Sequence, residues 1–144
     1  MAETLGSLCD KLTIVKLKQF HSEDRGQLQS LAMQEKQLQT EIDEFVNAAV
    51  THQIPISQLT FASNKVYKET GNVAPNVQGT IGKVFSQLAQ VNCSLWHEQE
   101  KVYEFEKVPA DEKNIVVKQL ALLNLERNNC MDQIDKQFTA LIER

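Results

Sequence analysis

Two short segments of the chain place a histidine and acidic residues after an aromatic side chain. The first is QFHSED at 19–24, in which the chemically active side chains are His21, Glu23 and Asp24. The second is LWHEQE at 95–100. Imidazole and carboxylate groups act as general acids and bases, and they are also common ligands of divalent metals. We therefore take these two segments as the first candidates for a binding or catalytic site.

In the second segment the candidates are Trp96, His97 and Glu100. On a helix, a histidine and an acid three positions later lie on one face and can interact. The simplest interpretation is a surface pair, or a face that is buried in a dimer. The alternative is a metal or substrate site to which His21, Asp24, His97 and Glu100 contribute, as side chains on facing helices do in dimetal bundles. Those bundles use the order Glu-x-x-His and face inward, whereas the order here is reversed and the predicted face points outward.

Two further acids in the last predicted helix could take part in metal chemistry. Asp132 and Asp135 have i, i+3 spacing. This spacing resembles that of the magnesium-binding acids in all-helical nucleotide pyrophosphohydrolases of the MazG kind, which would imply a divalent-metal-dependent hydrolase. The simpler interpretation is that Asp135 and its counterpart Asp43 are solvated residues beside the core or members of salt bridges.

An internal duplication relates the two halves of the chain. After a shift of 76 residues, residues 4–25 align with residues 80–101, and after a shift of 92 residues, residues 27–50 align with residues 119–142. The aligned identical positions include His21 with His97 and Asp43 with Asp135. The shifts differ by 16 residues, which are inserted in the second copy. The sequence therefore predicts two related helical hairpins, the second with helices that are each about two turns longer.

The spacing of apolar residues predicts four helices, because they recur every three or four positions as in a helix packed in a bundle or coiled coil. We expect helices near 3–23, 27–50, 79–107 and 109–143. The predicted fold is an all-α, up-and-down helical bundle made of two duplicated antiparallel helical hairpins. The chain 1–144 would be a single domain with a first hairpin at 3–50, a linker at 51–78 with a short helix near 57–71, and a second hairpin at 79–144.

The start of each hairpin carries the same local signal. Thr4 and Thr80 are predicted N-caps, because a threonine hydroxyl can accept a hydrogen bond from an amide of the first helical turn. Gly6 and Gly82 follow two residues later, and a glycine inside a helix suggests a close approach of another backbone. Pro109 predicts the start of the fourth helix, since proline is favoured at the first helical position.

A charged pair is predicted near the centre of the bundle. Glu35 and Arg127 both fall within apolar stripes, at corresponding positions of the two halves. A lone charge in a core is costly, so we expect Glu35 and Arg127 to approach each other there.

Composition limits the classes of function. The chain has 144 residues, a formal net charge of −4 and no run of basic residues, which argues against nucleic-acid binding. The sequence contains no stretch of about 18 apolar residues, so we expect no membrane span. The three cysteines, Cys9, Cys93 and Cys130, have no CxxC spacing, so we expect buried thiols in a cytoplasmic protein.

Three motifs resemble those of a known family. ETLGSLCDKLTIVKLKQFHSED, SLWHEQEK and LNLERNNCMDQID are similar to motifs of the domain of unknown function 4254 family, a mainly bacterial group. HEQE stands where that family has HxED, and Ala121 stands in place of an aspartate. The resemblance implies the helical fold and an association with bacterial cell-surface glycan genes. The family has no established activity, so the resemblance implies none. The matching positions are Glu3, Thr4, Gly6, Ser7, Leu8, Asp10, Lys11, Leu12, His21, Glu23, Asp24, Trp96, His97, Glu100, Asn124, Arg127, Asn128, Ile134 and Asp135.

These observations predict a non-enzymatic interaction or scaffold module without a cofactor, since the sequence has no P-loop, nucleophile elbow or zinc-ligand spacing. We expect a homodimer, because a second copy would bury the outward-facing Phe20 and Trp96. The alternative is the divalent-metal-dependent hydrolase, acting on nucleotides or sugar-phosphates and linked to cell-surface glycan synthesis.

Overall fold

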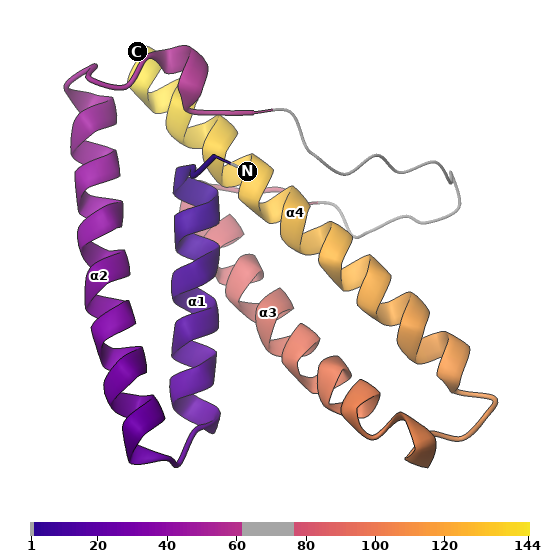
Figure 1. The fold of residues 1–144 in the computed structure, drawn as a ribbon. Helices are drawn as coiled ribbons and strands as arrows, with labels where there is room; N and C mark the ends of the chain where they lie inside the picture. Colours follow the sequence, from indigo (N-terminus) through magenta and orange to yellow (C-terminus); the bar gives the residue numbers. More distant parts are fainter. Residues whose placement is uncertain (1, 62–76) are drawn as a thin grey trace. The chain divides into compact units, whose positions relative to one another are not determined.

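Four α-helices make up most of the described chain. The computed structural model describes residues 2–61 and 77–144, and Figure 1 shows that this part is helical, without a strand. The predicted all-α helical bundle is confirmed, whereas the duplication stays a prediction from the sequence. The elements in chain order are α1 (Leu5–His21), α2 (Arg25–Val50), the 3₁₀ helix η1 (Ile56–Gln58), α3 (Ile81–Tyr103), the 3₁₀ helix η2 (Phe105–Lys107) and α4 (Lys113–Glu143).

The helices form two compact units. The first contains α1, α2, η1 and the end of α4 from Met131. The second contains α3, η2 and the part of α4 up to Cys130, so α4 belongs to both units. None of the helices in the described ranges is long and apolar enough to cross a membrane.

The start of α1 is fixed by the predicted cap. The Thr4 hydroxyl accepts a hydrogen bond from the Ser7 amide at 3.2 Å, and the Ser7 hydroxyl oxygen accepts one from the Thr4 amide at 2.8 Å. This reciprocal capping box satisfies amides that the first turn would otherwise leave without partners. The Ser7 hydroxyl also lies 2.9 Å from a carboxylate oxygen of Glu3, which ties the preceding residue to the helix.

The turn between α1 and α2 differs from the prediction. α1 ends at His21, and Asp24 caps α2 by accepting a hydrogen bond from the Gln27 amide at 3.0 Å. α2 therefore begins at Arg25, two residues before its predicted start. An aspartate at the N-cap both accepts this bond and interacts favourably with the positive end of the helix dipole, which explains the early start.

α1 and α2 lie side by side and antiparallel (Figure 1). The Lys16 ammonium donates to the Glu35 carboxylate at 2.8 Å, and the Gln19 amide donates to the same carboxylate at 3.2 Å. Val15 from α1 and Leu31 from α2 are buried. The cross-helix bonds fix which residues of the two helices lie at the same level.

The end of α4 completes the first unit. The rings of Phe45 on α2 and Phe138 on α4 lie 6.3 Å apart between centroids. The backbones of α1 and α4 approach each other closely at Gly6, where an added Cβ would lie 2.5 Å from the backbone oxygen of Met131. The close approach predicted at Gly6 is therefore confirmed. The neighbouring backbone lies so near that a side chain with a Cβ would not fit at this position.

In the second unit, α3 has the predicted apolar stripe but a different start. Val84, Leu88 and Val91 are buried along the helix. Thr80 stands at the N-cap, but its side chain makes no capping hydrogen bond. A Cβ added at Gly82 would meet nothing within 4 Å among the described residues, so the close approach predicted there is wrong.

The turn of the second hairpin is longer than predicted. α4 begins at Lys113 instead of 109, because a turn closed by the Glu112 amide on the Pro109 oxygen, at 2.9 Å, precedes it. The Lys113 ammonium lies 5.0 Å from the centre of the Phe105 ring, a cation–π contact. α3 has 23 residues against 17 in α1, and α4 has 31 against 26 in α2. Each helix therefore gains less than the predicted two turns.

The linker predicted at 51–78 contains η1, which is followed by the buried Leu59. The short helix predicted near 57–71 lies mostly outside the described residues. Ser57, the first residue of that predicted range, lies inside η1, whose N-cap is Pro55.

Candidate functional site

The first histidine-and-acid segment is divided by the end of a helix. His21 is the last residue of α1, and its ring meets the Phe20 ring edge-on, with centroids 5.2 Å apart. Asp24 is occupied as the N-cap of α2, and Glu23 is exposed in the turn. The predicted arrangement of His21 and Asp24 on one helical face is therefore wrong, because α1 ends before the acid is reached.

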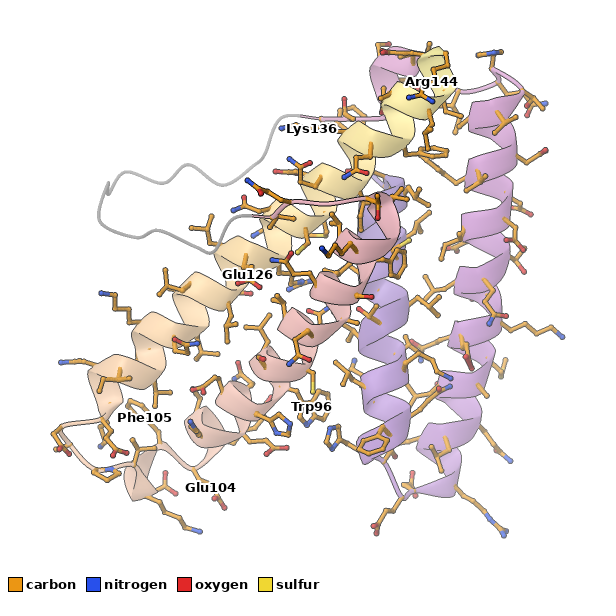
Figure 2. All side chains as sticks on the ribbon, turned by 180° about the vertical axis from the view of Figure 1, so that it is seen from behind. Trp96, Glu104, Phe105, Glu126, Lys136 and Arg144 are labelled. Atoms are coloured by element: carbon orange, nitrogen blue, oxygen red, sulfur yellow. The ribbon has the colours of Figure 1, made fainter. Side chains whose placement is uncertain are left out.

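The second segment forms one continuous turn of α3. The Trp96 indole donates to Glu100 Oε1 at 2.9 Å, and His97 Nδ1 lies 3.9 Å from Glu100 Oε2. The contact expected between this histidine and the acid three positions later is present. His97 and Glu100 are exposed, and Figure 2 shows Trp96 on the same helix. The carboxylate is hydrogen-bonded to the indole and lies near the imidazole. A binding role for this face stays a prediction.

The candidate metal ligands do not gather into a cluster. Within residues 2–61 and 77–144, no group of three or more His, Cys, Asp and Glu side chains is arranged to hold a metal ion. The candidate ligands of the first unit are His21 and Asp24, which have separate roles, and the pair Asp132 and Asp135 on α4. The pair supplies two carboxylates at most.

Asp135 has a structural partner on α1. Its Oδ1 accepts a hydrogen bond from the Gly6 amide at 2.7 Å, and its side chain also bonds with that of Thr4. The residue is only 7% exposed. Thus the interpretation of Asp135 as a solvated residue is wrong, although its counterpart Asp43 is exposed. The carboxylate binds the Gly6 amide in the first turn of α1, where the helix dipole favours a negative charge.

Burial changes the acidity of the groups around this contact. Burial raises the pKa of Asp135 to about 6, the bonds from Gly6 and Thr4 oppose the rise, and the nearby Asp132 adds to it. Burial also raises the pKa of Asp132, against the opposing charge of Lys136. The pKa of the Cys9 thiol rises to about 12, chiefly by burial and then by the charges of Asp135 and Asp10. A thiol of this kind stays protonated at neutral pH and is a poor nucleophile.

Glu35, one member of the predicted charged pair, is bonded to residues other than Arg127. Its carboxylate accepts hydrogen bonds from Lys16 and Gln19, and the bond from Lys16 is the main reason why its pKa is lowered. These partners belong to the first hairpin, whereas Arg127 belongs to the second unit. A pairing of Glu35 with Arg127 stays a prediction.

An open groove between α1 and α2 was missed by sequence reasoning. It has a volume of about 370 Å³, and its apolar floor is formed by Ile14, Val15 and Leu38. One wall carries lysines from α1, and the other carries two amides and an acid from α2. The apolar spacing of the helices could not reveal it, because the groove depends on the register between them. The full lining is Lys11, Ile14, Val15, Lys18, Gln34, Gln37, Leu38 and Glu41.

Comparison with known proteins adds no relative: no family model, curated protein or solved structure matches the chain. The resemblance to the domain of unknown function 4254 family therefore stays a prediction from the motifs. Two of the three motifs are in contact in the structure, because the Gly6 amide of the first motif donates a hydrogen bond to Asp135 of the third.

Proposed function

We propose that the chain is a non-enzymatic interaction module whose binding surface is the groove between α1 and α2. The observation that carries this proposal is the composition of the groove: an apolar floor lies between a wall with Lys11 and Lys18 and a wall with Glu41. Amphipathic helices bind in grooves of this kind, with apolar side chains on the floor and charged ones along the rim. The net charge of −4 favours protein partners over nucleic acid.

Exposed apolar side chains give the proposal further support. Phe20 is 84% exposed at the end of α1, and Met33 is 74% exposed on α2. In the second unit Tyr103 and Ile115 are exposed near the hairpin turn, where Figure 2 also shows Glu104 and Phe105. Large aromatic and methionine side chains are enriched in the centres of protein interfaces. The outward-facing Phe20 was one reason to expect a partner from the sequence.

The alternative, a divalent-metal-dependent hydrolase of nucleotides or sugar-phosphates, has less geometric support. Its acids would be Asp132 and Asp135, but one oxygen of Asp135 is already bonded to the Gly6 amide. A catalytic metal usually takes several protein oxygen ligands besides its waters. The candidate acids elsewhere have their own partners, as with Asp24 at the start of α2 and Glu100 beside Trp96.

The proposal also places the module in the cytoplasm. None of the three cysteines forms a disulfide, and all three lie in the described residues. Unpaired thiols are the rule in reducing compartments. The low-acidity thiol of Cys9 also suits a structural role, because its pKa is raised to about 12.

The test is crosslinking from the groove in living cells. A photo-crosslinking amino acid replaces Gln37, at the centre of the groove, and in a matched variant it replaces Gln29, which is exposed on the same helix outside the groove lining. We expect defined crosslinked products from position 37 that are absent from position 29, identified by mass spectrometry. Equal, diffuse products from both positions would contradict the proposal.

A further inference from the structure

The two helices that form the groove carry opposite charge. α1 contains Lys11, Lys16 and Lys18 against a single acid, Asp10, which gives a formal charge of +2. α2 contains four acids, Glu35, Glu41, Asp43 and Glu44, against Arg25 and Lys36, which gives −2. Among the residues that line the groove, α1 contributes the cations Lys11 and Lys18, and α2 contributes a single charged side chain, the acid Glu41.

The register of the hairpin places these charges along the groove. The bond between Lys16 and Glu35 marks one level of the two helices. Lys11 lies five residues from Lys16, and Glu41 lies six residues from Glu35 in the same direction, because the helices are antiparallel. Lys11 and Glu41 thus share one end of the groove.

The other end of the groove is shared by Lys18 and Gln34, by the same register. One end therefore has a cation facing an anion across the groove, and the other has a cation facing an amide. This distribution limits the ways in which a charged partner can lie on the surface.

A single-sign partner does not fit both walls. An acidic helix would be attracted by Lys11 and Lys18 but repelled by Glu41. A basic helix would be attracted by Glu41 but repelled by the two lysines. Like charges brought together at an interface are costly, so the fitting partner carries both signs in a matching arrangement. The first hairpin of another copy of this chain has that arrangement.

Resting on the proposed function, we infer that the groove is covered by a second copy of the chain, with α1 of each protomer against α2 of its partner. Two-fold symmetry makes every contact occur twice. If the axis runs parallel to the helices, Lys11 faces the partner's Glu41 and Lys18 faces the partner's Gln34. If the axis runs across them in the same plane, Lys11 faces the partner's Lys18 instead. Charge selects the first arrangement.

The resulting dimer has ordinary packing. Two antiparallel hairpins that face each other form a four-helix arrangement around Ile14, Val15 and Leu38 from both protomers. Lys11 also donates to Glu3 in its own chain. An ammonium group has three donors, so this bond leaves Lys11 able to meet an acid of the partner.

The experiment is sedimentation equilibrium of the full-length chain and three charge-reversed variants. Lys11→Glu and Glu41→Lys each turn two attractive contacts of the dimer into repulsive ones, so we expect each to weaken self-association by about tenfold or more. Asp43→Lys is the matched control, because it makes the same charge change as Glu41→Lys on an exposed position of α2 outside the groove lining. We expect it to dimerise like the unmodified chain.

Mixing the two weakened variants provides the decisive observation. A heterodimer of Lys11→Glu with Glu41→Lys restores opposite charges at both contacts, so the mixture should dimerise about as tightly as the unmodified chain. Circular dichroism of each variant alone shows whether its helices are intact. If folded variants dimerise normally, or if mixing restores nothing, the inference is overturned.

The same measurement separates this inference from the proposed function. A chain that stays monomeric at every concentration, while position 37 crosslinks to a different protein, overturns the dimer and leaves the interaction module in place. A monomeric chain with no specific crosslink from position 37 overturns both.

Discussion

The starts of α1 and α3 share a sequence pattern and differ in structure. Thr4 and Gly6 lie in a buried first turn, where the threonine caps the helix and the glycine touches the backbone of α4. Thr80 and Gly82 are exposed, with no side-chain cap and open space around the glycine. The same residue types therefore acquire a role only where a neighbouring helix covers them. Three pairs of substitutions at corresponding positions can test this: two pairs at these helix starts, and the pair Asp135 and Asp43, of which Asp135 bonds to Gly6.

The largest difference is expected between the two glycines. In Gly6→Ala the new methyl group would lie 2.5 Å from the Met131 carbonyl oxygen, so backbone must move. We expect a loss of about 2–3 kcal/mol in the free energy of unfolding. In Gly82→Ala nothing is displaced, and the loss of backbone freedom in the unfolded chain should stabilise the protein by about 0.4–1 kcal/mol. Urea unfolding followed by circular dichroism measures both, and equal effects would refute the comparison.

The next difference concerns the two aspartates and pH. Burial raises the pKa of native Asp135 to about 6, whereas in the unfolded chain it returns to about 3.9. Between these values the native state binds more protons than the unfolded state, so stability from this group increases as pH falls from about 6 to about 4. Its full size is on the order of 2–3 kcal/mol.

Asp135→Asn should remove this contribution, because the amide keeps an oxygen for the Gly6 amide but does not titrate. Asp43→Asn is the matched variant on an exposed position and should leave the pH dependence of stability as it was. Urea unfolding between pH 4 and pH 7.5 gives the measurement. If Asp135→Asn follows the same pH curve as the unmodified chain, the buried carboxyl does not control it.

The smallest difference is expected between the two caps. Thr4→Ala removes the acceptor for the Ser7 amide and the side-chain bond to Asp135, so we expect a loss of about 1–2 kcal/mol. Thr80→Ala removes no side-chain capping bond and should change stability by less than about 0.5 kcal/mol. Thermal melts of the two variants give the measurement, and an equal fall in melting temperature would show that the Thr4 side chain stabilises the protein no more than the Thr80 side chain does.

Apolar spacing was enough to predict the helices, but not the places where they begin and end. The sequence motif QFHSED suggests a chemical role for Asp24, whereas the structure shows this residue as the N-cap of α2. Pro109 was placed at the first helical position, whereas it opens a turn that precedes α4. Both errors arise because the same residue types serve in caps, turns and sites, and only the local backbone separates these roles.

The candidate site was predictable only where its geometry is local. The contact between His97 and Glu100 follows from helical spacing and is present. The burial of Asp135 could not be read from its likeness to Asp43, since it depends on the packing of α4 against α1. The groove depends on the register between α1 and α2, to which the bonds from Lys16 and Gln19 to Glu35 contribute.

The bond between Gly6 and Asp135 joins residues that are 129 positions apart. During synthesis at roughly 5–20 residues per second, the first turn of α1 therefore waits on the order of ten seconds for its carboxylate partner. The first hairpin can form early from local contacts. The surface of α1 around Gly6, which α4 later covers, stays exposed to water, chaperones and proteases throughout that interval. Completion of the first unit is thus timed by the ribosome, with α4 as its closing step.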